Sequence, residues 1–343
     1  MNTHEYSQWF RGSTPYISAH RGKTFVVYVG GDALANPNIT NTVHDLALLH
    51  ILGVNLVLVH GDTTTSMAAA VTCFSLSIAV GHVEAGLRTN NLASPFPEEF
   101  NRRVSALAAR FHFAPTELNR QNLLAEGHAE QHVHVTGNTV VDALRLMVDR
   151  FTKNPDIREQ IEADFASMID GWPFTEQLVL VTSHRRENFG EGLRNICDAI
   201  KEMASLSTDV RFIYPVHPNP NVQVPVREYL SDCRNVHLIA PLSYEYFCFL
   251  LNRAHLILTD SGGVQEEAPS IGKPVLVMRD TTERPEAVSA GTVKLVGASK
   301  NEIIKHTRLL LTNQDEYKIM ATSGNPYGDG YAANKIASII ARD

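Results

Sequence analysis

The sequence has few cysteines and no apolar run long enough to cross a membrane. Its four cysteines are scattered and form no Cys-x-x-Cys pair: Cys73, Cys197, Cys233 and Cys248. This pattern argues against a disulfide scaffold and favours a reducing compartment, so we expect a cytoplasmic protein. No run of 18 apolar residues occurs, and the stretch MNTHEYSQWFRG lacks the apolar core of a signal peptide. We therefore expect no membrane partner.

Two common nucleotide-binding motifs are also missing. The chain contains no G-x-G-x-x-G, which leaves a nicotinamide dinucleotide site unsupported, and no G-x-x-x-x-G-K-[ST] of a P-loop. His132 and His134 alternate on a predicted strand but lack further ligands at metal spacing, so we expect no metal site. With 37 acidic and 30 basic residues, the net charge of −7 argues against a general nucleic-acid binder.

What the chain does contain is an alternation of short apolar strands with longer helical stretches. Its 343 residues, 44% of them hydrophobic, suffice for about two globular domains. Strands are predicted at 24–29, 54–60, 78–83, 132–136, 178–183, 210–216, 236–240, 256–259, 274–278 and 293–296. Helices are predicted at 40–52, 65–76, 97–110, 117–126, 138–152, 191–206, 243–252, 264–271 and 300–312. Continuously apolar strands such as LVLVT are typical of buried parallel sheets, and the alternation predicts a doubly wound α/β fold.

A charged, mostly helical stretch at 146–176 interrupts this alternation. It ends in Gly171-Trp172-Pro173, after which strands and helices resume. We predict Rossmann-like domains at 1–146 and 147–329, with a helix at about 330–343 packing back on the first. Ligands of such folds bind at the carboxyl ends of the strands, here in an interdomain cleft.

Three acidic residues lie at strand or helix ends in the first half. Asp62 follows the run VNLVLVHG, Glu84 ends GHVE, and Glu98 lies in SPFPEE. Each also has a structural explanation: Asp62 as a helix N-cap, Glu84 as a loop partner of Arg88, and Glu98 as a first-turn acid after a proline. Their conjunction favours a catalytic cluster, because neighbouring carboxylates raise one another's pKa and keep an acid and a base available.

Basic side chains follow the first strands of the second half. His184 and Arg185 come directly after LVLVTS and suit an anionic phosphate, whereas Arg186 and Glu187 are also explained as a surface pair. His217 lies in the Pro-rich segment YPVHPNPN, which either lines the cleft or forms a turn.

The sharpest candidate site is the segment DSGGVQEEA at 260–268. Ser261, Gly262 and Gly263 connect an apolar strand to a helix, and such glycines allow a phosphate to approach backbone N–H groups. Glu267, one turn into the helix, is placed to accept ribose hydroxyls. The charged loop 279–286 has two interpretations: it contributes to the binding site at the same edge of the sheet, or it is simply a solvated loop.

Long motifs in the correct order carry a family resemblance. They are LVLVHGDTTT, VGHVEAGLRT, SPFPEEFNRR, VTGNTVVDAL, VTSHRREN, YPVHPNPNV, ILTDSGGVQEEAPSIGKPVLVMRDTTERPEAV and NPYGDG. From about Val57 onward the chain resembles the non-hydrolysing UDP-N-acetylglucosamine 2-epimerases. The resemblance implies two Rossmann-like domains in the GT-B arrangement, a homodimer, and interconversion of UDP-GlcNAc and UDP-ManNAc without a cofactor.

The resemblance also implies a mechanism and its residues. UDP is eliminated with loss of the C2 proton to give 2-acetamidoglucal, and UDP adds back after protonation on the opposite face. The catalytic residues would be Asp62, Glu84, Glu98 and His184, with the assignment of each carboxylate to a face left open. Substrate would be bound by Ser261, Gly262, Gly263, Glu267, Arg185, Phe247 near the base, and His217 at a second, regulatory UDP-GlcNAc.

The beginning of the chain departs from this family. The Gly-Thr-Arg-Pro-Glu loop and the Gln-His-Arg segment of the epimerases have no counterpart here. Residues 11–60, with Lys23 and Gly30-Gly31, instead resemble the start of bacterial N-acetylglutamate synthase. We therefore expect a first domain that is truncated and rebuilt at its N-terminus, with epimerase activity reduced or absent. The alternatives are a non-catalytic UDP-sugar binding protein and a GT-B glycosyltransferase.

Overall fold

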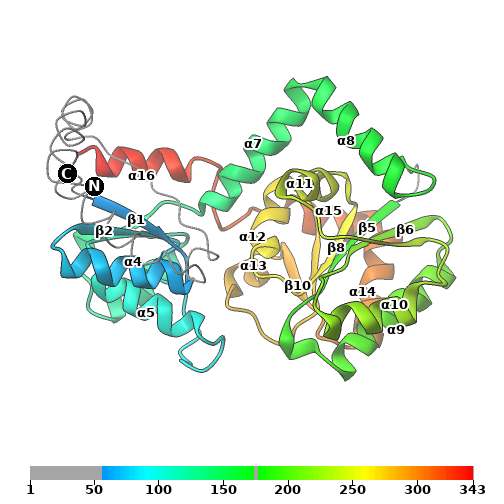
Figure 1. Cartoon of the computed structure of the whole chain (residues 1–343), viewed down its shortest axis with the longest axis horizontal. Coiled ribbons are helices and arrows are strands. Elements are labelled where there is room, and N and C mark those ends of the chain that lie inside the picture. The colour runs from blue at the N-terminus through cyan, green and yellow to red at the C-terminus, as the bar shows by residue number, and fades with distance from the viewer. Residues whose placement is uncertain (1–55, 174–176, 343) are drawn as a thin grey trace, which may run out of the picture. The chain divides into compact units, whose positions relative to one another are not determined.

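The computed structural model describes residues 56–173 and 177–342 (Figure 1). The predicted strand 24–29, the predicted helix 40–52 and most of the segment 11–60 lie outside these residues. Internal contacts divide the chain into two compact units that join between Thr136 and Gly137. The assignment of domains as 1–146 and 147–329, with a C-terminal helix on the first, stays a prediction.

The first unit contains a parallel sheet of four strands in the order β1-β2-β3-β4. The strands are β1 (Leu56–His60), β2 (Ala79–Val83), β3 (Phe111–Ala114) and β4 (Val133–Val135); the connecting helices are α4 (Thr64–Ser75), α5 (Glu98–Ala108) and α6 (Glu117–Ala125), with a 3-10 turn η1 (Glu130–His132) before β4. Because the strands are parallel, the loops after β1 and β2 leave the same edge of the sheet. That edge carries the predicted carboxylates.

The sequence prediction missed β3. Its four residues, FHFA, form a very short run between two helices, and a histidine interrupts the apolar pattern. All four side chains are nevertheless buried, and β3 pairs with both β2 and β4. Burial lowers the pKa of His112 to about 3, so its imidazole is neutral and packs against the ring of His128 at 4.3 Å between centroids.

The second unit contains a parallel sheet of six strands in the order β10-β9-β8-β5-β6-β7. The strands are β5 (Gln177–Thr182), β6 (Val210–Pro215), β7 (Val236–Ile239), β8 (Leu256–Thr259), β9 (Val275–Val277) and β10 (Val293–Leu295). Both faces are covered, which explains the continuously apolar strands. Leu178 and Leu180 of β5 enter one hydrophobic core, and the alternate residues Val179 and Val181 enter the other.

Helices on each face of this sheet complete the two cores. One core is shared with α7 (Thr139–Lys153), α8 (Pro155–Met168) and α11 (Tyr244–Arg253); the other with α9 (Glu191–Leu206), α10 (Pro220–Leu230) and α14 (Lys300–Thr312). Figure 1 shows α11 on one side of the strands and α9 and α10 on the other. The remaining elements are η2 (Arg186–Asn188), α12 (Val264–Glu267), η3 (Ala268–Ile271), α13 (Pro285–Ser289), α15 (Gln314–Thr322) and α16 (Ala332–Ile340).

Strand order places a switch point between β5 and β8. From β5 the chain proceeds to β6 and β7 on one side and then returns to β8 on the other. Ligands of open α/β sheets bind outside the carboxyl ends of strands at such a point. The loop after β5 carries His184, and the loop after β8 carries Ser261. Within residues 56–173 and 177–342, no helix is long and apolar enough to span a bilayer.

Two local predictions need adjustment. The Pro-rich loop is shorter than predicted, because the helix α10 already begins at Pro220. Asn219 caps this helix: its side-chain oxygen accepts a hydrogen bond from the amide of Asn221 at 2.9 Å. The predicted helix 264–271 is one α-helical turn, α12, followed by the 3-10 turn η3.

Candidate active site

Asp62 lies in the turn between β1 and α4 and is held by α5. Its Oδ2 accepts a hydrogen bond from Nη2 of Arg102 at 2.6 Å, and its main-chain oxygen accepts one from Nδ2 of Asn101 at 2.8 Å. The N-cap of α4 is Thr63, whose Oγ1 accepts from the amide of Ser66. Asp62 is therefore not the cap of this helix, and its carboxylate stays partly exposed at the sheet edge.

Glu84 follows β2 in a strained backbone conformation. Its φ is +65°, a left-handed value that costs a non-glycine residue roughly 1–2 kcal/mol. Its Oε2 lies 3.6 Å from Nε2 of His60, the last residue of the adjacent strand β1. Arg88, the alternative loop partner, forms a two-pronged ion pair with Glu126 at 2.7 and 2.8 Å. Such strain persists where surrounding structure fixes it, often at functional positions.

Gly86 fixes the loop that follows Glu84. Its φ is +92°, and a Cβ built on it would lie 2.2 Å from the main-chain oxygen of Asn119 in α6. Nδ2 of Asn122, also in α6, donates to the carbonyl oxygen of Gly86 at 2.9 Å. The loop is thus in direct backbone contact with α6.

Glu98 and its neighbour Glu99 have different environments at the start of α5. Glu99 is fully buried, and its carboxylate accepts from the amides of Thr89 and Asn90 at 3.0 and 3.1 Å. Oε2 of Glu98 is buried without a hydrogen-bond partner among the described residues. Glu99 therefore stabilises the preceding loop, whereas Glu98 has a carboxylate oxygen that is available to a ligand.

These three carboxylates belong to one edge of the first unit. Asp62 and Glu84 follow strands that pair directly, and α5, which begins with Glu98, binds Asp62 through Arg102 and Asn101. No group of three or more His, Cys, Asp or Glu side chains in the described part of the chain is arranged to hold a metal ion. The arrangement suits proton transfer by carboxylates.

His184 begins the corresponding edge of the second unit. Its side chain is 42% exposed, and its ring stacks on that of His217 with 5.5 Å between centroids. Burial of the remainder lowers the pKa of His184, Arg185 and His217 lower it further, and Asp260 opposes them. The buried carboxylate of Asp260 accepts hydrogen bonds from the amides of His184 and Arg185 at 3.0 Å. The rings of His184 and His217 thus lie together, and the cleft interpretation of the Pro-rich segment stays a prediction.

The Ser-Gly-Gly turn after β8 is packed closely against an arginine. The amide of Ser261 donates to Oγ1 of Thr259 at 2.9 Å. A Cβ built on Gly262 would lie 2.5 Å from Nη1 of Arg284, so a side chain there would force Arg284 or the turn to move. Gly263 is the N-cap of α12 and has ordinary helical angles. The close approach of Arg284 explains why residue 262 is a glycine. Neither Gly262 nor Gly263 is required by an unusual backbone conformation.

Arginines at this edge divide into paired and unpaired groups. Arg284 donates to Glu266 at 2.5 Å and to Glu283 at 2.8 Å. Burial alone would raise the pKa of Glu283, but Arg284 and Arg279 hold it at about 2. Nε of Arg185 is buried without a hydrogen-bond partner in the described part of the molecule. Arg185 is therefore the guanidinium best suited to receive an anion.

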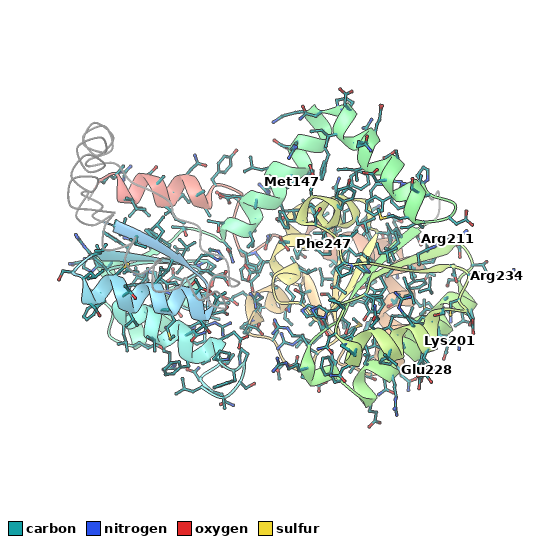
Figure 2. All side chains as sticks on the ribbon, in the orientation of Figure 1. Met147, Lys201, Arg211, Glu228, Arg234 and Phe247 are labelled. Carbon is teal, nitrogen blue, oxygen red and sulfur yellow. The ribbon has the colours of Figure 1, made fainter. Side chains whose placement is uncertain are left out.

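Glu267 and α11 form the far side of the turn. Oε1 of Glu267 accepts a hydrogen bond from the hydroxyl of Tyr244 at 3.0 Å, and burial raises the pKa of this carboxyl. Phe247 lies one turn after Tyr244 on α11, partly buried against the core (Figure 2). Glu267 and Phe247 thus occur on elements joined by one hydrogen bond.

Sequence reasoning missed the residues that hold these groups. Asp260 follows β8 within the DSGG motif, and Arg102 and Glu99 lie in the motif SPFPEEFNRR. Their motifs were recognised, but only the structure shows their burial and their partners. A buried acid directly after an apolar strand was the available signal for Asp260.

Comparison with known proteins gives one consistent family. A family model described as UDP-N-acetylglucosamine 2-epimerase matches residues 38–341. The UDP-N-acetylglucosamine 2-epimerase of Escherichia coli K12 is 51% identical over 289 residues, covering 83% of this chain and 75% of that protein. The crystal structure of the Neisseria meningitidis UDP-GlcNAc 2-epimerase, bound to UDP-GlcNAc, superposes with a TM-score of 0.82 at 47% identity, covering 90% of this chain and 84% of that one. A Staphylococcus aureus MnaA–UDP structure gives a TM-score of 0.80 at 37% identity over 92% of this chain and 82% of that one.

The match extends further toward the N-terminus than predicted. It begins at residue 38 and so includes part of the segment 11–60, whose resemblance to N-acetylglutamate synthase stays a prediction. The parallel α/β sheets agree with the predicted GT-B fold. The chain belongs to the UDP-N-acetylglucosamine 2-epimerase family.

Proposed function

We propose that the protein interconverts UDP-GlcNAc and UDP-ManNAc by eliminating UDP and adding it back. A carboxylate takes the C2 proton while the C1–O bond breaks and its electron pair leaves with UDP, giving 2-acetamidoglucal. A carboxylic acid on the opposite face then protonates C2 as the diphosphate oxygen re-forms the bond to C1. The chemistry is acid–base catalysis and needs no redox cofactor.

One observation carries this proposal: Asp62, Glu84 and Glu98 gather at one edge of one sheet. Inversion at C2 needs an acid and a base on opposite faces, and three carboxylates supply more than one candidate for each. Oε2 of Glu98 has no hydrogen-bond partner among the described residues, which leaves it available to a substrate proton.

The second unit supports the proposed role for the diphosphate. His184 and the buried Nε of Arg185 supply donors to phosphate oxygens, and the Ser261–Gly263 turn allows close backbone approach. The lowered pKa of His184 means that the free imidazole is neutral near pH 7; a bound diphosphate raises the pKa again, so that a protonated imidazole can donate a hydrogen bond to the departing UDP. Glu267 would accept the ribose hydroxyls, Phe247 would contact the base, and His217 would contact a regulatory UDP-GlcNAc.

Incubation with UDP-GlcNAc in deuterated water tests the function. The expected result is UDP-ManNAc with deuterium at C2, read by mass spectrometry and proton NMR. Free sugar plus UDP would indicate a hydrolysing enzyme, and a new glycoside a glycosyltransferase. UDP affinity by calorimetry without C2 exchange would contradict the proposal and leave a UDP-sugar binding protein. The predicted loss of the N-terminal arginine loop makes the expected rate lower than that of the E. coli relative.

The proposed partner is a second copy of the chain. Large apolar side chains are exposed on the packed pair α4 and α5, among them Phe74 at 66% and Leu107 at 78% exposure. A patch of this kind on a folded unit is typical of a protein interface. Sedimentation analysis should give a dimer for the wild type and a smaller species for Leu107→Asp.

A further inference from the structure

Asp260 is the most heavily hydrogen-bonded carboxylate at the second-unit edge. It follows β8 and is fully buried. Its Oδ2 accepts from Oγ of Ser183 at 2.8 Å and from the amides of His184 and Arg185 and Nδ2 of Asn188, each at 3.0 Å. Four donors exhaust this oxygen, so the carboxylate cannot rotate without breaking several bonds.

The other oxygen faces the imidazole of His184. Oδ1 accepts only a longer bond from the amide of His184, at 3.1 Å, and lies 3.7 Å from Nδ1 of the same residue. This separation is only slightly longer than a hydrogen bond, and the ring is partly exposed. Nδ1 is the nitrogen on the side of Asp260, which leaves Nε2 for a ligand.

The charges around His184 come from three loops. Arg185 on its own loop and His217 after β6 disfavour a positive imidazole, and only Asp260 after β8 favours one. Arg185 in turn lies near Glu283, which is paired with Arg284 and Arg279. Among the residues that the structure describes, Asp260 is therefore the negative group that acts directly on His184.

We propose that Asp260 is a positioning residue that keeps the proton of neutral His184 on Nδ1 and directs Nε2 toward the departing diphosphate. The inference rests on the proposed function for the leaving group, but the state of the imidazole is measurable without turnover. Asp260 touches no substrate; it acts through His184, by fixing both its backbone and its tautomer. The same charge stabilises the imidazolium that forms when Nε2 receives a proton.

The first measurement uses the wild-type protein. Nitrogen-15 NMR of labelled histidine, assigned with His184→Gln, identifies the protonated ring nitrogen in the free protein at pH 8. The expected form carries hydrogen on Nδ1. Hydrogen on Nε2 would overturn the inference, whatever the activity.

Asp260→Asn and Ser183→Ala separate charge from backbone support. The asparagine side chain has the size of Asp260 and keeps one oxygen to accept hydrogen bonds from the four donors, but it carries no charge. We expect the titration midpoint of His184 to fall by about one pH unit and kcat to fall about 10- to 100-fold, with the pH profile shifted in the same direction. Ser183→Ala removes one donor and keeps the charge, so the midpoint should stay at the wild-type value. Asp209→Asn, in the exposed turn before β6, is the matched control for loss of one acid.

The outcomes distinguish this inference from the proposed function. A wild-type protein without C2 exchange contradicts the function, while the tautomer and the titration still decide the role of Asp260. An active wild type in which Asp260→Asn leaves the His184 midpoint unchanged contradicts the inference alone. If Asp260→Asn does not fold, the wild-type tautomer decides.

Discussion

The two sheet edges use charge in opposite ways. At the edge of the first unit, Asp62, Glu84 and Glu98 present carboxylates, and the basic side chain of Arg102 holds Asp62 in place. At the edge of the second unit, His184 and Arg185 present basic groups, and the buried acid Asp260 holds their loop. The first unit thus exposes acids supported by a base, and the second exposes bases supported by an acid. If the first edge transfers protons and the second binds the diphosphate, as we propose, the two functions should respond separately to mutation.

Asp62→Asn should break the first edge and spare the second. The amide keeps the size of the side chain but cannot act as a base, so C2 exchange should fall at least about 100-fold. UDP binding, measured by calorimetry, should stay within about twofold of the wild type, because the change removes a transition-state contribution only. The control is Glu117→Gln, an exposed acid on α6. A variant with undiminished exchange would refute the role of Asp62.

Gly262→Ala should disrupt the second edge and spare the first. The added methyl group meets Arg284, which two ion pairs hold in place, so the Ser-Gly-Gly turn must shift. We expect UDP affinity to fall about tenfold, with KM raised and kcat at saturation little changed. Gly324→Ala is the control, because a Cβ there meets nothing within 4 Å. Loss of kcat with unchanged KM would mean that the two edges are not separable in this way.

Acid should weaken the first unit more than the second. Burial lowers the pKa of His82 to about 4 and of His112 to about 3, both below the value of about 6.5 in an unfolded chain. The unfolded state therefore binds more protons between these values. The stability that neutral histidines provide is present above about pH 6.5 and is lost as pH falls toward 4 and then 3.

Hydrogen exchange with mass spectrometry at pH 7 and pH 5 measures this difference by peptide. After correction for intrinsic rates, protection of β1 to β4 should decrease by up to a few kcal/mol, since each pKa unit is worth about 1.4 kcal/mol. His112→Phe should flatten the pH dependence, and His132→Gln should not. Equal loss of protection in both units would contradict the assignment.

The sequence predicted more of the second unit than of the first. All six strands of the second sheet were predicted: β5, β8 and β9 have continuously apolar centres, and β6, β7 and β10 are short β-branched runs with one polar residue each. In the first sheet β3 was missed because its four residues include no β-branched side chain and follow the helix α5 almost at once, and only tertiary burial makes His112 behave as an aromatic residue. Local patterns carry no information about such compensation.

The site shows the same limit. The motifs identified which loops matter, because acids and bases directly after apolar strands are visible in one sequence. They did not separate Glu98 from Glu99, since both are first-turn acids, and the hydrogen bonds from Thr89 and Asn90 to Glu99 depend on how the preceding loop folds. Likewise, the supporting role of Asp260 depends on β5 and β8 being neighbours across a separation of more than 70 residues.

Gly86 gives a consequence for library design. Both Gly86 and Gly127 have left-handed φ values, +92° and +91°, yet a Cβ at Gly127 meets nothing within 4 Å whereas one at Gly86 meets the backbone of α6 at 2.2 Å. In a saturation library selected for epimerase activity, codon 127 should retain asparagine and aspartate, which tolerate this conformation. Codon 86 should return only glycine. Substitutions of Glu84 or Arg88 cannot be compensated by a shift of this loop, because its contact with the backbone of α6 fixes its position.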